Sequence, residues 1–236
     1  MRATQNNGNE FEYSITHWFQ PIHRLTDQVV IGYEALLRDP TQLHVSPVDI
    51  FNDAEKKGCR NILDLNSIKS AIEKFKNQTS LLFLNIFPST LLDNNFLSWW
   101  DAHVPPLLPV VLEILENEEI MDWCTLQTVI KWLKARGVKI ALDDMGAGYS
   151  SLRQWIELDP DFIKLDRYFS ENLSCSSRKQ KTVRSLVDLL SDAAEIIIEG
   201  IETREDLNAA KHLGITYAQG YLLGRPSPVG TLLAEG

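Results

Sequence analysis

Two kinds of segment alternate along the chain: short apolar or β-branched runs, and longer segments whose apolar residues recur every three or four positions. The short runs predict eight strands, near 18–22, 29–35, 80–86, 109–114, 139–142, 162–165, 195–198 and 217–222. The longer segments predict helices around 47–57, 62–76, 90–100, 123–135, 152–157, 180–192 and 204–213. Such alternation is typical of a parallel sheet covered by helices, and eight strands suit a TIM (β/α)8 barrel.

The first two strands are joined by residues 23–28 alone, which is too short for a crossover helix. They should therefore form a hairpin, so we predict an α/β fold: a modified TIM barrel with one antiparallel strand near its start. Local signals support several helix ends. Thr203 with Asp206 resembles an N-cap, and Gly137 and Gly214 lie where left-handed C-terminal residues usually fall.

Composition limits the classes of function. The chain has 236 residues and 44% apolar composition, enough for one core, and we expect a polar tail over 1–14 followed by a single domain over 15–236. A net charge of -9 argues against long nucleic acid as a partner, although metal ions could still bring in a small phosphorylated ligand.

Location is predicted from the cysteines and from hydropathy. The three cysteines are far apart and odd in number, which suits a reducing cytoplasm rather than a disulfide framework. The polar start has no signal-peptide pattern, and no apolar run reaches the roughly 18 residues of a membrane span. We therefore expect a cytoplasmic protein with no membrane attachment.

Polar side chains occupy the ends of nearly all predicted strands, where TIM barrels carry their active sites. They are Glu34, Asn85, Glu113, Asp143, Asp144, Lys164, Glu199 and Gln219. Converging buried carboxylates repel one another unless protons or cations compensate. Oxygen ligands suit Mg²⁺ or Mn²⁺, and the lack of His or Cys at these positions argues against zinc. Asp143 and Asp144 could serve two ions about 4 Å apart, as in phosphodiester hydrolysis.

Each of these residues also has an ordinary structural interpretation. Glu34 could be a solvated strand end, and Asn85 could organise a turn before a proline. Lys164 could point outward, and Asp166 could cap the segment that follows. The joint occurrence of so many polar strand ends favours a functional site.

An ordered set of motifs now resembles a known family, the EAL-type cyclic di-GMP phosphodiesterases. The motifs are YEALLR at 33–38, LNIFP at 84–88, LEILE at 112–116, DDMGAGYSSL at 143–152, IKLDR at 163–167, EGIET at 199–203 and AQGYLLGRPSP at 218–228. The resemblance covers nearly the whole chain from Phe19 onward. It implies a modified (β/α)8 barrel with one antiparallel strand, in agreement with the predicted hairpin.

The resemblance also implies roles for individual residues. Metal would be bound by Glu34, Asn85, Glu113, Asp143, Asp144 and Glu199. Catalytic roles would fall to Glu34, Asp144, Lys164, Glu199 and Gln219, with Lys164 orienting or helping to activate the attacking water. Glu116 would hold the loop over 144–151. Substrate would be contacted by Gln20, Arg38, Asp166, Glu202, Gln219 and Pro226, with Arg38 gripping a phosphate.

The implied reaction is attack by a metal-activated water on one phosphodiester of cyclic di-GMP, giving linear pGpG. Two divalent ions, Mg²⁺ or Mn²⁺, would assist, and a homodimer is expected. Two residues depart from the family pattern: Met145 stands where phenylalanine is usual, and Phe87 where a small or polar residue is common. Neither change removes a ligand.

Two other functions stay open at this point. The chain could be a catalytically silent domain of this family that acts as a cyclic di-GMP receptor or contacts another protein. It could also be a different metal-dependent TIM-barrel hydrolase that shares only the carboxylates. The retained ligands and Glu116 favour hydrolysis over silent binding, and Arg38, the GAGYSSL loop and the QGYLLGRP ending favour the cyclic dinucleotide.

Overall fold

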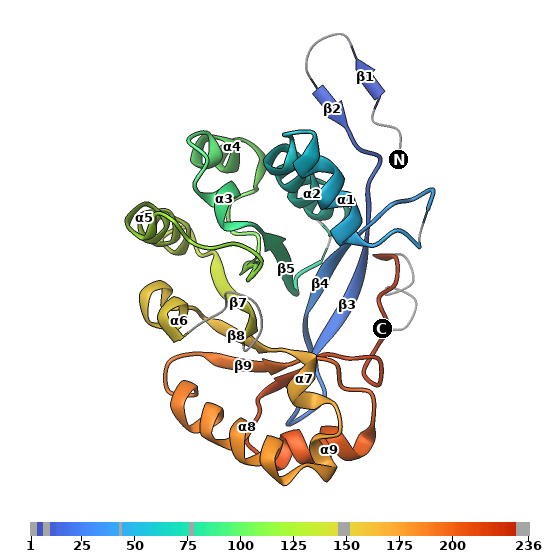
Figure 1. Ribbon diagram of the computed structural model, residues 1–236, viewed down its shortest axis with the longest axis vertical. Helices are drawn as coiled ribbons and strands as arrows, with labels where there is room; N and C mark the ends of the chain where they lie inside the picture. The colour runs from blue at the N-terminus through green and yellow to red at the C-terminus, as the bar shows by residue number, and fades with distance from the viewer. Residues whose placement is uncertain (1–3, 7–9, 43, 76–77, 146–151, 230–236) are drawn as a thin grey trace.

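The computed structural model describes residues 4–6, 10–42, 44–75, 78–145 and 152–229. Eight strands form a closed barrel in the order β10-β3-β4-β5-β6-β7-β8-β9 (Figure 1). They are β3 (Thr16–Arg24), β4 (Val30–Arg38), β5 (Leu81–Ile86), β6 (Val110–Ile114), β7 (Lys139–Met145), β8 (Phe162–Leu165), β9 (Glu195–Ile198) and β10 (Tyr217–Ala218). The predicted barrel is confirmed.

Strand β3 is the antiparallel member of this barrel. It pairs antiparallel with both of its neighbours, β4 and β10, whereas the other neighbouring strands pair in parallel. The hairpin between β3 and β4 turns at Gln28, whose φ of 61° is left-handed. The predicted hairpin and irregular barrel start are therefore both confirmed.

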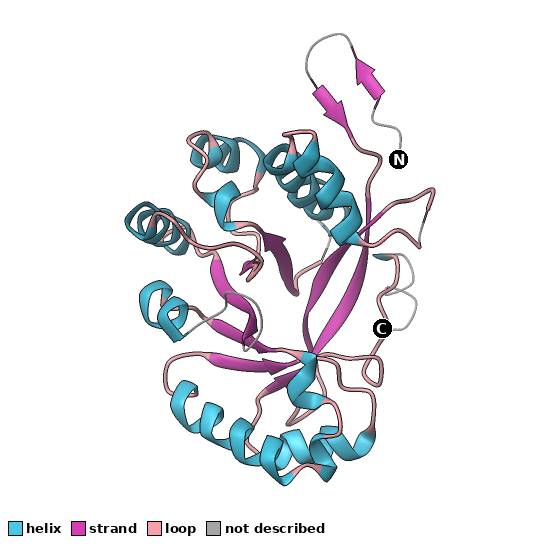
Figure 2. Ribbon diagram, in the orientation of Figure 1, coloured by secondary structure: helices cyan, strands magenta, loops and turns pink. Residues whose placement is uncertain are grey.

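Helices surround the barrel (Figure 2). They are α1 (Pro47–Lys56), α2 (Arg60–Phe75), α3 (Pro88–Leu91), α4 (Phe96–His103), α5 (Trp123–Lys134), α6 (Leu152–Leu158), α7 (Arg167–Ser170), α8 (Ser177–Leu190) and α9 (Arg204–His212), with a 3₁₀ turn η1 (Leu173–Cys175). The predicted helix ends are confirmed: the Thr203 side chain accepts a hydrogen bond from the backbone N–H of Asp206. Gly137 and Gly214 have φ values of 81° and 88°.

The structure corrects two predicted elements. The helix expected over 90–100 is two helices, α3 and α4, because the Asp93 side chain accepts a hydrogen bond from the backbone N–H of Asn95 at 2.8 Å and so forms a local turn. The strand expected over 217–222 ends at Ala218. The chain bends at Gly220, where a Cβ atom would lie 2.2 Å from the backbone of Ile201.

Four further elements were not predicted. Helix α7 and the turn η1 follow β8, and both are too short to show a helical period. Within the tail predicted over 1–14, β1 (Thr4–Asn6) and β2 (Glu10–Glu12) pair as an antiparallel hairpin. None of the helices in the described part of the chain combines the length and apolarity of a membrane span.

The barrel interior explains why polar residues gather at one end. An apolar layer fills it, made of Ile22, Phe83, Val111, Ala141, Phe162 and Ile197. Side chains two positions apart on a strand share a face, so the residue two positions further along points into the same interior, one layer higher. Five parallel strands place Asn85, Glu113, Asp143, Lys164 and Glu199 at that next position. The apolar layer is therefore the floor of a polar site.

Candidate active site

Lys164 lies at the centre of this polar layer and is 1% exposed. Its Nζ atom lies 2.6 Å from Glu199 Oε1, 2.9 Å from Asp143 Oδ1, 3.0 Å from Glu113 Oε1 and 3.5 Å from Glu34 Oε2. Burial by itself would lower the lysine pKa, but these four carboxylates outweigh it and raise that pKa well above its ordinary value. The ammonium group is therefore held charged, and the interpretation of Lys164 as an outward-facing residue is excluded.

One lysine does not compensate four carboxylates. Burial raises the pKa of Glu113 well above its ordinary value, although Lys164 acts in the opposite direction. Burial also raises the pKa of Glu199 to about 8, against the effect of Lys164 and with repulsion from Asp143. Without more positive charge, part of this cluster must keep protons near neutral pH. The site is therefore short of cations.

Two amide side chains hold Glu34 in place. Gln219 Nε2 donates to Glu34 Oε2 at 2.7 Å and to Gln20 Oε1 at 3.1 Å, and Asn85 Nδ2 donates to Glu34 Oε1 at 3.1 Å. Burial raises the pKa of Glu34, but Lys164 and these amide donors together bring it below its ordinary value. Glu34 is thus held in its charged form, with Asn85 and Gln219 as its direct supports and Gln20 bonded to Gln219.

A bulge in β7 brings consecutive aspartates to the same site. The pairing of β7 with β8 shifts register between Leu142 and Met145, and Asp144 has a left-handed φ of 46°. Neighbouring residues of a regular strand point to opposite faces, and a bulge re-aims them. Oxygen atoms of Asp143, Asp144 and Glu116 consequently lie within 4.8 Å of one another. Burial raises the pKa of Asp144 to about 7, helped by repulsion from Asp143 and Glu116.

The donor set fits divalent cations. Among the residues that the structure describes, the buried Glu113 Oε2 has no hydrogen-bond partner, and the buried Glu113 Oε1 and Asp143 Oδ1 have Lys164 as their only counter-charge. Such oxygens are costly to bury unless a cation compensates them, and carboxylate oxygen is the ligand that hard ions prefer. Asp143 belongs both to the Lys164 cluster and to the Asp144–Glu116 group, so it links the two.

Glu116, expected to support a loop, therefore also lies close enough to the two aspartates to bind metal. The loop it was expected to hold continues into 146–151, which lies outside the described residues, together with most of the GAGYSSL motif. Sequence reasoning did not assign Glu116 to the metal group, because it lies two residues beyond β6 and follows no strand period.

The other predicted substrate residues lie around the rim. Asp166 caps α7, accepting a hydrogen bond from the backbone N–H of Tyr168 at 2.9 Å. Glu202 pairs with Arg167 at 2.9 Å. Pro226 is half-buried beside Ser227, which bridges to β3. These residues are at the same end of the barrel as Lys164 but, within the described part of the chain, form no hydrogen bond or ion pair with the four carboxylates around it.

Arg38, expected to grip a phosphate, ends β4 next to the site. Its Nη1 atom donates to the Leu37 carbonyl at 2.7 Å, and its guanidinium lies 5.6 Å from the centre of the Trp18 ring. Burial lowers the pKa of Arg38, and the charge of Glu34 partly reverses that shift. The arginine is thus preorganised by its own strand and lies within the electrostatic range of the site.

Two cavities meet at this end of the barrel. One, of about 330 Å³, is lined by Lys164, Asp143, Asp144 and Glu199 among others. The second, of about 460 Å³ and more apolar, shares Glu34 with the first. Volumes of this size are typical of small-molecule sites. We place the chemistry in the smaller cavity because it contains the lysine and the carboxylates.

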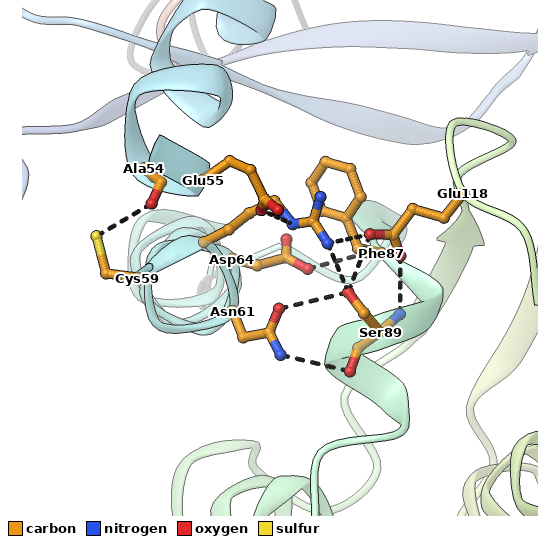
Figure 3. A network of polar contacts seen from close by, with 9 residues as sticks. Ala54, Glu55, Cys59, Asn61, Asp64, Phe87, Ser89 and Glu118 are labelled. Carbon is orange, nitrogen blue, oxygen red and sulfur yellow. Dashed lines mark hydrogen bonds and ion pairs between the residues drawn. The ribbon is translucent and has the colours of Figure 1, made fainter. Parts of the chain in front are cut away.

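The two residues that depart from the family pattern, Met145 and Phe87, both pack against neighbouring side chains. Met145 is buried beside Leu165 of β8. Phe87 lies in the wall of the larger cavity, its ring 5.1 Å from that of Phe51. Its backbone N–H donates to Asp64 at 3.0 Å, and the neighbouring Ser89 donates to Glu118 (Figure 3).

Arg167 is a residue of the site that sequence reasoning did not single out. It lines the smaller cavity with Lys164 and pairs with Glu202. The available signal was its place in the IKLDR motif, directly after Asp166, but no periodicity shows which way a residue after a strand end will turn.

Fold and site together define a class: a barrel protein with an interior carboxylate cluster suited to divalent metal. Comparison gives the family, since the profile of the EAL domain matches residues 9–226, and the chain belongs to that family. A relative from Escherichia coli, "Probable cyclic di-GMP phosphodiesterase PdeI", is 30% identical over 227 residues. The match covers 89% of this chain but 28% of that protein, so the chain spans less than a third of its length.

Solved structures resemble the chain over most of its length. The calcium and cyclic di-GMP complex of Klebsiella pneumoniae BlrP1 matches with a TM-score of 0.80 and 30% identity, covering 91% of this chain and 56% of that one. The manganese and cyclic di-GMP complex of the same protein matches with a TM-score of 0.79, covering 94% and 58%.

Proposed function

We propose that this chain is a metal-dependent phosphodiesterase that hydrolyses cyclic di-GMP to linear pGpG by attack of a metal-activated water. The observation that carries the proposal is the buried cluster of Glu34, Glu113, Asp143 and Glu199 around Lys164, with Asp144 beside it. Membership of the EAL family and relatives named as cyclic di-GMP phosphodiesterases support the substrate.

Two divalent ions, Mg²⁺ or Mn²⁺, would be bound by different parts of this cluster. Glu34, Asn85, Glu113 and Asp143 would hold one, and Asp144 the other, with Asp143 shared and Glu116 as a further candidate ligand. When bound, such ions polarise a phosphoryl oxygen and lower the pKa of water. The structures of BlrP1 with calcium or manganese support divalent metal in this fold.

The protein's own side chains can orient the attacking water and stabilise the charge that develops during hydrolysis. Lys164 keeps its charge within 3.5 Å of four carboxylates, so its ammonium group can orient the attacking water and offset negative charge that develops at phosphorus. Gln219 and Asn85 fix both oxygens of Glu34. The apolar floor beneath closes the site to water from the barrel interior.

Hydrolysis of cyclic di-GMP by the purified chain tests the proposal, with Mg²⁺ or Mn²⁺ present and with a parallel binding titration. Glu34→Ala should abolish formation of pGpG, because it removes a ligand together with the carboxylate that Gln219 and Asn85 hold in place. Glu73→Ala, on an exposed position of α2, is the matched control and should keep wild-type turnover.

Other outcomes would change the assignment. Tight binding of cyclic di-GMP without turnover would identify a silent receptor, and neither binding nor turnover would exclude this substrate. A homodimer and a cytoplasmic location stay predictions, and sedimentation velocity of the purified chain would measure the first.

A further inference from the structure

The smaller cavity has an unusual distribution of charge. Its lining includes the acidic residues Glu34, Asp143, Asp144, Glu199 and Glu202, and the basic residues Lys164 and Arg167. A cyclic dinucleotide brings two phosphodiesters, each with one negative charge. Metal ions at the carboxylate cluster would neutralise the phosphodiester being cleaved. The second phosphodiester needs its own cation.

Lys164 is not available for that task. It is 1% exposed, and its single ammonium group already lies within 3.5 Å of four carboxylate oxygens. An ammonium group has three hydrogen-bond donors, all of which these carboxylates can use. Lys164 therefore serves the cleavage centre, and its burial keeps it out of reach of a second phosphate.

Arg167 has the accessibility that Lys164 lacks. Its side chain is 55% exposed and its partner Glu202 is 43% exposed, with 2.9 Å between Arg167 Nη2 and Glu202 Oε1. Exposed pairs of this kind contribute only about 0.2–1 kcal/mol to stability, so exchanging the partner costs little. A guanidinium group offers five donors in a planar fork that matches a phosphate.

The backbone holds Arg167 over the cavity. The cap at Asp166 fixes the start of α7, of which Arg167 is the first residue. Across from it lies Gly200, where a Cβ atom would approach Arg167 Cγ to 2.4 Å and where φ is +68°. The stem of the arginine thus crosses the chain directly after Glu199, whose carboxylate contacts Lys164. Only glycine allows that path.

We propose that Arg167 binds the phosphodiester of cyclic di-GMP that is not cleaved, releasing Glu202 as it does so. The inference rests on the proposed substrate and adds a second phosphate-binding residue to Arg38. It makes Arg167 a substrate-binding residue for the cyclic, doubly charged ligand, with no part in cleavage itself.

Calorimetric binding titrations in Ca²⁺ test this, with cyclic di-GMP and with the linear dinucleotide GpG as ligands. GpG has the same two guanosines but a single phosphodiester. Arg167→Gln should weaken binding of cyclic di-GMP about tenfold, the effect of losing one charge-assisted phosphate contact, and leave GpG binding unchanged. Arg167→Lys should lose less affinity for cyclic di-GMP, because lysine keeps the positive charge but lacks the planar pair of guanidinium donors.

Arg136→Gln is the matched control. Arg136 is also half-exposed and paired with a carboxylate, Asp101, but it precedes β7 and so lies at the opposite end of the barrel. Its replacement should leave the affinities for cyclic di-GMP and for GpG unchanged. In turnover assays, Arg167→Gln should raise KM about tenfold and preserve kcat.

Three results would overturn the proposal. The first is an equal loss of affinity of Arg167→Gln for cyclic di-GMP and for GpG. The second is an unchanged affinity of this variant for cyclic di-GMP, and the third is a fall in its kcat with KM unchanged. Failure of the wild-type chain to bind cyclic di-GMP would instead refute the proposed function. The two failures are therefore distinguished by whether the wild-type protein or only the Arg167 variant loses binding.

Discussion

Replacing Lys164 by methionine removes the only cation that the structure shows among the four carboxylates of the central cluster. Methionine has a similar length and suits an apolar floor, so the change is mainly electrostatic. The carboxylates then repel one another in a buried setting. We expect the metal-free protein to lose stability, and to lose more of it at higher pH.

The magnitude follows from the number and length of the contacts. One pair of unit charges 4 Å apart is worth about 4 kcal/mol at an effective dielectric constant near 20, and these four pairs are shorter. Breaking a buried pair costs about 3–5 kcal/mol. Proton uptake by the carboxylates limits the loss, so we expect about 3–5 kcal/mol at pH 8.

The pH dependence has a definite sign. Carboxylates that lose Lys164 have pKa values raised above those of the unfolded chain, so the folded state binds more protons and becomes less stable as pH rises. The difference between wild-type protein and Lys164→Met should therefore be larger at pH 8 than at pH 6.

Urea unfolding in the presence of a chelator, followed by tryptophan fluorescence at pH 6 and pH 8, measures both quantities. Lys131→Met, at an exposed position of α5, is the control for the loss of one lysine. A loss below about 1 kcal/mol at pH 8, or the same loss at both pH values, would refute the reasoning about the cluster.

Three further predictions concern other parts of the molecule. Burial lowers the pKa of His17 to about 3, so below pH 6.5 the unfolded chain binds a proton that the folded chain does not. The contribution of His17 to the free energy of unfolding therefore falls by about 1.4 kcal/mol per pH unit as the pH drops below 6.5. His17→Gln should flatten this dependence of the unfolding free energy on pH, measured by urea titration. The same dependence of unfolding free energy on pH in the wild-type protein and in His17→Gln would contradict this prediction. Thr203→Ala removes the cap of α9 and should lower the unfolding free energy by about 1 kcal/mol, whereas an unchanged midpoint would argue against the cap. Glu116→Gln should weaken Mn²⁺ binding about tenfold in a calorimetric titration, and unchanged affinity would place Glu116 outside the metal group.

Local rules were sufficient for the barrel and for many of its boundaries. Strand and helix periods differ, and the five residues between β3 and β4 allow only a hairpin, so the antiparallel start follows from chain length alone. Thr203, Gly137 and Gly214 act through their own backbone neighbourhood and were correctly assigned. Asp93 was missed because a side chain that bonds to its own backbone competes with a helix without changing the apolar period.

The sequence by itself determined which chemical groups reach the end of the barrel, because a period of two fixes the face of each strand residue. Tertiary structure alone decided how they meet. Gln219 and Glu34 are 185 residues apart and yet share a hydrogen bond. The bulge in β7 turns Asp144 toward Glu116, and the space above Gly200 admits Arg167. Such contacts depend on barrel closure and on side-chain packing, which no local pattern of residues encodes.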